Sequence, residues 1–281
     1  MKIDKLTNIF FSATGTTKKI IKSISKGLNI KEIREIDLTK SNNRERFNLE
    51  FQKNELLIIG IPVYAGRVPD FLISILKKLK GNQPVILVSV YGNIDEGLAL
   101  EQLKDLLGKR GFKIIGAASF IGEHSYSCKE FRIAHGRPDK QDLNQAKKFG
   151  EKILSKFIKN SNIKDIPEIK LDIDKSLFSH LLSIILPIIS LPQYGSKKFI
   201  KKPYLNTNRC NHCQICVELC PMKAIDKKTL KIDDSKCIRC MSCVKNCPQE
   251  ARKIEYKIPF LVKKFFELNK SNERKTPNIY L

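Results

Sequence analysis

The chain has 281 residues, 42% of them hydrophobic, and a formal net charge of +23 from 52 Lys and Arg against 29 Asp and Glu. This much apolar material excludes a disordered chain, and the length allows one large domain or two of unequal size. The charge excess fits a nucleic acid, an anionic membrane surface or an acidic protein partner, and it also fits lysines spread over solvated faces. Because no run of Lys or Arg is long enough to form a basic tail and no nucleic-acid-binding signature is present, no nucleic-acid partner is expected.

The first residues, MKIDKLTNIFFSATG, lack the apolar run and the cleavage site of a secretory signal, so we expect a cytoplasmic protein. Thiols stay reduced in that compartment. A dense group of cysteines there indicates a metal site more often than a set of disulfides.

Apolar strands alternate with amphipathic helices over the first 160 residues. We predict strands at 6–12, 32–38, 55–61, 84–91 and 112–121, several of which are the continuous apolar runs that helices cover on both faces. The predicted helices span 16–28, 69–80, 95–109 and 138–157. This alternation predicts an α/β domain with a doubly wound, five-stranded parallel sheet, which binds its ligand outside the carboxyl ends of the strands.

The stretch FFSATGTTKK, residues 10–19, joins the first predicted strand to the first predicted helix. It contains four hydroxyl side chains and a glycine that permits a tight turn, and a helix start presents free backbone amides and a positive dipole end. These features predict a phosphate-binding loop, and a simple helix N-cap is the alternative. Neither a Walker loop nor a G-x-G-x-x-G dinucleotide fingerprint is present.

The loop resembles the S/T-x-T-G-x-T loop with which flavodoxins hold the phosphate of FMN. That resemblance implies a flavodoxin-like sheet of order 2-1-3-4-5, and two later loops, GIPVYAGRVP at 60–69 and VSVYGNIDEG at 88–97, would flank the flavin ring. Tyr64 and Tyr91 would stack on the ring, with ordinary half-buried packing as the alternative for each. The implied FMN residues are Ser12, Thr14, Gly15, Thr16, Thr17, Pro62, Tyr64, Ala65, Gly66, Tyr91, Gly92, Asn93 and His124.

The predicted loop 122–138 is long enough to be functional. Its candidates for covering a flavin or meeting a substrate are His124, Ser125, Tyr126, His135 and Arg137. Cys128 lies in the same loop, and we interpret it as an inert thiol because a lone cysteine is seldom a nucleophile.

Residues 161–202 connect two parts of the chain. They include SLFSHLLSIILPIISLP, residues 176–192, which is short for a membrane span and contains two prolines. A buried or domain-docking helix, an interfacial helix and a true span all fit this segment. Together with the lysines near residue 200, it leaves peripheral membrane contact through 176–202 open.

Eight of the nine cysteines form two copies of C-x2-C-x2-C-x3-C-P, offset by 27 residues. Three thiolates in one tight loop can hold three irons of a 4Fe-4S cluster, and in two-cluster modules the fourth cysteine binds the other cluster. We therefore predict two clusters. The first is assigned to Cys210, Cys213, Cys216 and Cys247, and the second to Cys220, Cys237, Cys240 and Cys243. Zinc and disulfides fit this spacing less well.

The repeat resembles bacterial two-cluster ferredoxins over residues 203–254. The resemblance implies a small, pseudo-symmetric α+β domain and electron transfer at low potential. One departure is that residues 203–253 hold 10 Lys and Arg against 5 Asp and Glu, whereas such ferredoxins are typically acidic. Its redox partners, possibly acidic in this case, are therefore not those of the acidic ferredoxins, and the oligomeric state is left open.

The chain as a whole resembles the flavodoxin-ferredoxin fusion proteins of anaerobic prokaryotes. The predicted organisation is a flavodoxin-like domain at 1–160, the connecting segment at 161–202 with its apolar helix, the ferredoxin domain at 203–254 and a basic, aromatic tail at 255–281. This predicts an electron-transfer protein that couples FMN to two 4Fe-4S clusters and converts between one- and two-electron carriers. The alternatives are a flavin-dependent reductase of a quinone or nitro compound fed by the clusters, and a ferredoxin on a flavin-free docking domain.

Overall fold

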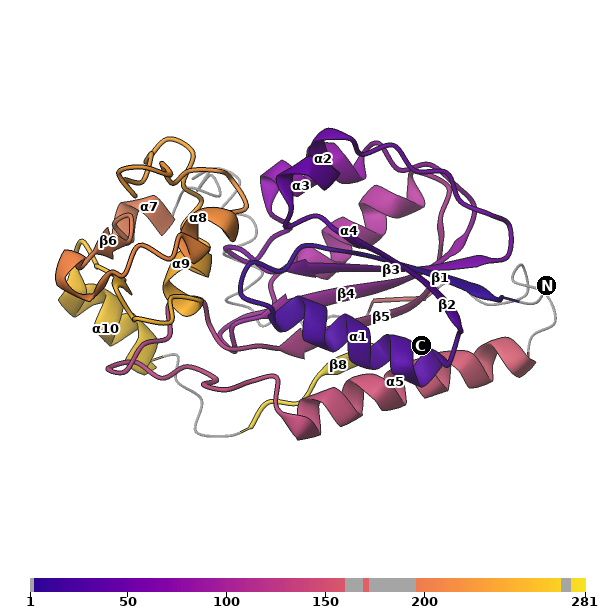
Figure 1. Cartoon of the computed structure of the whole chain (residues 1–281). Coiled ribbons are helices and arrows are strands. Elements are labelled where there is room, and N and C mark those ends of the chain that lie inside the picture. Colours follow the sequence, from indigo (N-terminus) through magenta and orange to yellow (C-terminus); the bar gives the residue numbers. More distant parts are fainter. Residues whose placement is uncertain (1–2, 160–168, 172–195, 269–273) are drawn as a thin grey trace. The chain divides into compact units, whose positions relative to one another are not determined.

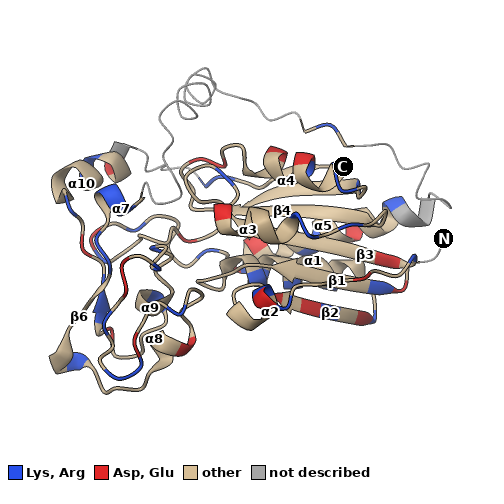
Figure 2. Ribbon diagram, turned by 90° about the horizontal axis from the view of Figure 1, so that it is seen from above, with Lys and Arg blue, Asp and Glu red and all other residues tan. Residues whose placement is uncertain are grey.

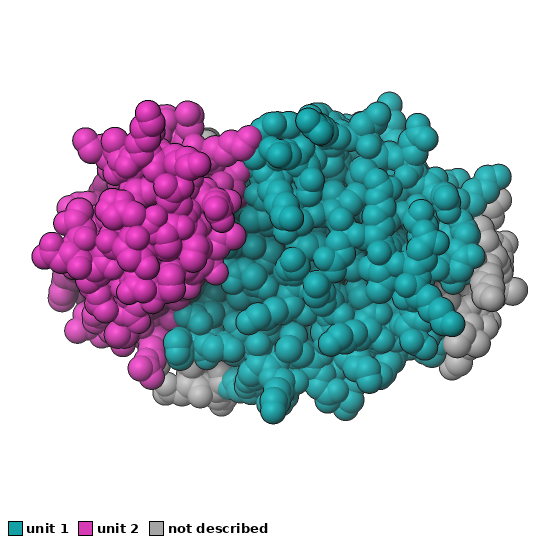
Figure 3. Space-filling view, in the orientation of Figure 1, with its two compact units in different colours: residues 1–124, 134–172, 271–281 teal, residues 125–133, 173–270 magenta. Residues whose placement is uncertain are grey.

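The structure is a computed structural model, and it describes residues 3–159, 169–171, 196–268 and 274–281. Two compact units form, and neither is one continuous stretch of chain (Figure 3). The first unit contains residues 1–124, 134–172 and 271–281, and the second contains 125–133 and 173–270. The domain boundaries expected at 160, 202 and 254 stay predictions. The apolar segment 176–192 lies outside the described residues.

The first unit is built on one sheet of six strands in the order β2-β1-β3-β4-β5-β8. The strands are β1 Lys5–Phe10, β2 Glu32–Asp37, β3 Glu55–Pro62, β4 Pro84–Tyr91, β5 Lys113–Ile121 and β8 Asn278–Tyr280. The first five are parallel, which confirms the predicted doubly wound sheet of order 2-1-3-4-5. The predicted number of strands was too low, because β8 adds an antiparallel strand to the edge of β5.

Helices cover both faces of this sheet (Figure 1). Helices α1 Thr16–Leu28 and α5 Lys140–Lys159 lie on one face, and α3 Asp70–Leu76 and α4 Ala99–Gly108 lie on the other. A short helix, α2 Ser41–Glu45, follows β2. The main core forms where Leu6, Ile24, Phe120 and Phe149 pack between the sheet and the α1 and α5 helices. Each strand of the parallel sheet is followed by a turn at the same edge, so the functional loops gather there.

Helices α1 and α5 approach each other closely at two glycines. A Cβ atom on Gly27 would lie 2.0 Å from the carbonyl oxygen of Lys147, and one on Gly150 would lie 2.2 Å from that of Ile24. Both obstacles are backbone atoms, so neither helix can yield by a simple rotamer change.

We expect a Gly27→Ala variant to lose stability by about 1–3 kcal/mol or more through overpacking. The measurement is thermal unfolding followed by circular dichroism. Gly108→Ala is the matched control, since a Cβ atom there meets nothing within 4 Å and alanine favours the helical conformation. An unchanged melting temperature for Gly27→Ala would contradict the close approach of the two helices.

The second unit is an internal duplication at the level of the backbone. Its described elements are α7 Ser196–Phe199, β6 Tyr204–Leu205, η2 Thr207–Arg209, α8 Ile215–Glu218, α9 Ser242–Lys245, β7 Arg252–Lys253 and α10 Pro259–Leu268. The helices α8 and α9 occupy equivalent places 27 residues apart. The hydrogen bond from Asn206 N to Ala251 O (2.8 Å) has its counterpart from Asp233 N to Ala224 O (2.7 Å).

Left-handed residues repeat with the same offset. Positive φ angles occur at the equivalent pairs His212 and Arg239, Gln214 and Met241, and Lys223 and Glu250. Non-glycine residues seldom adopt this conformation. Its recurrence between the cysteines of both motifs indicates that each loop must curl tightly to turn successive thiols toward one point.

Among the described residues, no helix is both long enough and apolar enough to cross a membrane.

Candidate functional site

The loop between β1 and α1 has the geometry of an anion site. Gly15 precedes the helix with a φ of 84°, and a Cβ atom built on it would meet nothing within 4 Å. Ser12 Oγ accepts a hydrogen bond from Lys18 N at 3.0 Å, so this hydroxyl caps the helix. The backbone amides of Thr14, Thr16 and Thr17 have no acceptor in the described part of the chain. These free donors stand at the positive end of a helix of 13 residues.

Thr17 adds a buried, unpartnered hydroxyl to the same loop. Its side chain is 0% exposed, and its Oγ1 lacks a hydrogen-bond partner within the described ranges. A Cβ atom on Gly60 would lie 3.2 Å from Thr17 Cγ2, and one on Gly122 would lie 3.0 Å from Thr16 Cβ. The loop is therefore pressed against the ends of β3 and β5. An orphaned buried hydroxyl costs free energy unless something pairs with it, which fits a bound phosphate.

The loops after β3 and β4 contact each other through backbone atoms. Tyr64 and Arg67 exchange two backbone hydrogen bonds (3.0 and 3.1 Å), and this turn contains Ala65 and Gly66 at positive φ. Leu98 N donates to Gly66 O at 2.7 Å. The two loops predicted to flank a ring therefore form one continuous wall.

Within this wall the predicted ring contacts differ in exposure. Tyr64 and Pro62 are half-buried, whereas Tyr91 is only 6% exposed, and burial raises the pKa of Tyr91 to about 12. Asn93 is 7% exposed at a φ of 64°, and its Oδ1 has no donor among the described residues. The ring of His124 lies against Gly92, since a Cβ atom there would be 2.3 Å from His124 Cδ2. The structure thus brings all the predicted FMN residues to one edge of the sheet.

The long loop 122–138 divides between the two units. His124, His135 and Arg137 belong to the first unit, where His135 contacts Glu123 and Arg137 forms a buried ion pair with Asp142 at 2.6 Å. Ser125 and Tyr126 belong to the second unit. Burial raises the pKa of Tyr126 to about 12. Cys128 Sγ lies 3.7 Å from Tyr256 Oη.

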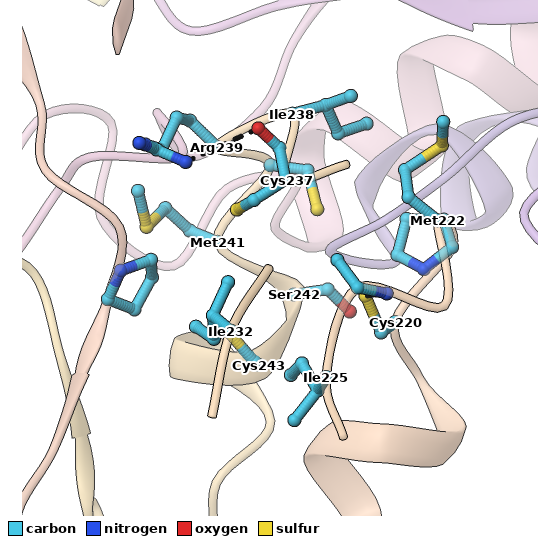
Figure 4. Close-up of a pocket in the computed structure, with 14 residues that line it drawn as sticks. Cys220, Met222, Ile225, Ile232, Cys237, Ile238, Arg239, Met241, Ser242 and Cys243 are labelled. Carbon is cyan, nitrogen blue, oxygen red and sulfur yellow. Dashed lines mark hydrogen bonds between the residues drawn. The ribbon is translucent and has the colours of Figure 1, made fainter. Parts of the chain in front are cut away.

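The eight cysteines of the motifs line two cavities in the second unit, four to each. The first-motif cavity is lined by Cys210, Cys213, Cys216 and Cys247. The second-motif cavity is lined by Cys220, Cys237, Cys240 and Cys243, together with apolar side chains such as Ile225 and Ile232 (Figure 4). The fourth cysteine of each motif therefore lines the cavity of the other motif.

The two cavities differ in their surroundings. Cys243 is buried and Cys213 is exposed. Burial raises the pKa of Cys220, raises that of Cys240 to about 12 and raises that of Cys243 further. These values are for the protein alone, so the second-motif thiols need a strong positive centre to ionise, which the irons of a cluster would supply.

Backbone donors repeat between the cavities. Ala224 N donates to Cys220 Sγ and Ala251 N donates to Cys247 Sγ, both at 3.2 Å. No three His, Cys, Asp or Glu side chains of the described residues converge closely enough for a single metal ion. A cluster holds its ligands around a larger body than one ion does, so four cysteines around a cavity fit a cluster.

Two buried arginines beside the cavities were missed by sequence reasoning. Arg239 is 3% exposed and donates to Cys237 O at 3.3 Å (Figure 4). Arg252 is 2% exposed, and its Nη2 lies 3.9 Å from Cys216 Sγ. Their signal is weak, since a single arginine between or after ligands has no pattern. Figure 2 shows further Lys and Arg along the loops of this unit, with fewer Asp and Glu.

Comparison with known proteins assigns the second unit to a family. Residues 202–248 match the family described as 4Fe-4S dicluster domain. No curated protein matches the chain.

Several solved structures resemble the first part of the chain. A flavodoxin from the domain Archaea is 15% identical with a TM-score of 0.38, covering 56% of this chain and 99% of its own. The WrbA-like flavodoxin of Agrobacterium tumefaciens is 12% identical with a TM-score of 0.36, covering 56% and 98%. The apo form of an NADH:FMN oxidoreductase is 16% identical with a TM-score of 0.41, covering 58% and 93%. From the sheet order 2-1-3-4-5 and the family match, the chain is a fusion of a flavodoxin-like fold with a 4Fe-4S dicluster domain.

Proposed function

We propose that this protein is an electron carrier that holds two 4Fe-4S clusters and one FMN and exchanges electrons between one- and two-electron partners. The observation that carries the proposal is the pair of four-cysteine cavities, built crosswise from two motifs, in a chain that also has an anion-binding loop on a flavodoxin-like sheet. When bound, the clusters supply one-electron transfer and the flavin supplies one- or two-electron transfer.

In the second unit, the cysteines of each cavity would hold one cluster. The amides of Ala224 and Ala251 would donate to ligand sulfurs, and such hydrogen bonds raise the reduction potential of a cluster. Arg252 would place a positive charge beside the first-motif cavity. Ile225 and Ile232 would keep water away from the second-motif cavity.

In the first unit, the amides at the start of α1 and the hydroxyl of Thr17 would bind the FMN phosphate. Ser12 would support them by capping the helix. The wall formed by the loops after β3 and β4 would face the ring, with Asn93 Oδ1 as an acceptor for a ring N–H. Tyr64 offers a half-buried aromatic face for stacking, and Tyr91 would support the wall from the core.

Its partners would be redox proteins with an acidic docking surface, because basic residues outnumber acidic ones two to one over residues 203–253. The burial of Tyr126 in the second unit supports a carrier over a reductase, since this side chain was a candidate for lining a substrate pocket. A cytoplasmic location and the absence of a nucleic-acid partner remain part of the proposal.

The test is quantification of iron, acid-labile sulfide and acid-released flavin in one anaerobically purified sample, with an absorption spectrum. We expect about eight irons and one FMN per chain. About eight irons without flavin, even after incubation with excess FMN, would reject the carrier and leave a ferredoxin on a flavin-free unit. Fewer than about five irons would reject the two-cluster assignment.

A further inference from the structure

The C-terminal strap, defined as residues 274–281, returns to the first unit beside the loop that follows β4. We infer that Lys275 is a positioning residue for FMN, because it holds the backbone of residues 93–96 in the shape that receives the ring. This inference rests on the proposed flavin site and names a residue outside the predicted FMN set.

The strap is firmly attached on both sides of Lys275. Arg274 pairs with Asp139 through two hydrogen bonds (2.8 and 2.9 Å) and with Asp142 at 2.8 Å. This guanidinium holds the pKa of Asp139 well below its usual range, so the pair stays ionised at neutral pH. After Lys275, β8 pairs with β5 through Ala117, Ala118 and Ser119. Lys275 is therefore presented to the loop from an anchored backbone.

The ammonium of Lys275 makes two hydrogen bonds to the loop. Its Nζ donates to Asn93 O at 3.0 Å and to Ile94 O at 2.9 Å. Asn278 Nδ2 adds a third link by donating to Glu96 Oε1 at 2.8 Å. Two successive carbonyls that converge on one charged donor define the orientation of the peptide between them.

That orientation matters at Asn93. This residue is held at a φ of 64°, a strained conformation for a residue with a side chain, and its buried Oδ1 has no donor in the described part of the protein. Without the ammonium, the carbonyls of Asn93 and Ile94 would lose their shared partner and the strained turn could relax. The acceptor Oδ1 would then leave the position that suits a ring N–H. Glu96 Oε2, also unpartnered among the described residues, would move with it.

The test compares Lys275→Met with Lys53→Met, which makes the same change at an exposed residue before β3, at the opposite edge of the sheet. Both proteins are prepared as the full chain with clusters loaded and flavin removed. The first readout is the dissociation constant of added FMN, from quenching of flavin fluorescence. The second needs no flavin, and it is hydrogen exchange of residues 92–98 compared with β4.

We expect Lys275→Met to weaken FMN binding by at least about tenfold, as loss of a charge-assisted hydrogen bond does. Exchange should accelerate in residues 92–98 while β4 stays protected, and Lys53→Met should match the wild type. Lys275→Arg should recover much of the affinity, because a guanidinium can also donate to two carbonyls. Asn278→Ala, which removes a single link, should show a smaller change of the same kind and replaces Lys275→Met if that variant does not fold.

Equal FMN affinity in Lys275→Met and wild type would overturn the inference while leaving the flavin site intact. Faster exchange throughout β4 and β5 would overturn it as well, because Lys275 would then stabilise the whole sheet edge. If the wild type binds no FMN, the proposed function fails at this unit and the positioning role fails with it. The exchange experiment would still report whether the strap holds the loop.

Discussion

A Cys240→Ala variant is expected to retain about half of the iron and sulfide of the wild-type chain. Cys240 lines the second-motif cavity with Cys220, Cys237 and Cys243, whereas all four cysteines of the first-motif cavity remain. Alanine removes the ligand without offering a substitute oxygen. Iron and sulfide measured against protein concentration, under anaerobic conditions, give the result directly.

Double variants test the crosswise grouping more sharply. Cys220→Ala with Cys240→Ala removes two ligands from one cavity and should cost no more iron than Cys240→Ala alone. Cys220→Ala with Cys213→Ala removes two ligands of the same sequence motif but of different cavities, so nearly all iron should be lost. Cys128→Ala is the control and should keep the full iron content, because Cys128 lies outside both cavities. If the same-motif pair kept half of the iron, each motif would hold its own cluster and the crosswise grouping would be wrong.

A Thr17→Val variant is expected to weaken FMN binding while leaving the flavin-free protein as stable as before, or slightly more stable. The hydroxyl of Thr17 is buried and unpartnered in the described structure, so replacing it with a methyl group removes an unpaired polar atom. If that hydroxyl donates to the phosphate, its loss should raise the dissociation constant of FMN about 10- to 100-fold. Fluorescence titration and thermal unfolding measure the two effects separately.

Thr7→Val provides the opposite pattern as a control. Thr7 is also fully buried, but its hydroxyl donates to Glu55, which is itself 1% exposed. Removing that donor leaves a buried carboxylate oxygen unpaired, so stability should fall by about 1–3 kcal/mol while FMN affinity stays unchanged. A Thr17→Val protein with wild-type affinity would show that this hydroxyl does not contact the phosphate.

Sequence patterns predicted the parallel sheet well because its strands are buried on both faces. ELLIIGIP and PVILVSVY are continuous apolar runs, and they form β3 and β4 with nearly the predicted limits. The predicted helix at 69–80 is shorter in the structure, where α3 ends at Leu76 and single turns follow. Strand β8 was missed because it has three residues and pairs with a strand far upstream. Such pairing leaves no local periodicity.

The candidate site divides in the same way. Motif spacing predicted which cysteines share a cavity, because the loop between the ligands is too short to allow many arrangements. Arg239, Arg252 and Lys275 act through backbone carbonyls or a single sulfur, contacts that depend on the folded chain and carry no sequence pattern. The split of the loop 122–138 between the two units was equally hidden, because its composition does not change at residues 124 or 134.

The antiparallel strand β8 also has a consequence for biosynthesis. A ribosome completes β1 to β5 long before it reaches residue 278, and it must first release the whole cysteine-rich segment between them. During that interval the edge of β5 has no neighbour on its outer side, and an open edge invites pairing with other chains. Co-translational chaperones or rapid cluster insertion would therefore matter most for nascent chains that have emerged past β5 but not yet to β8.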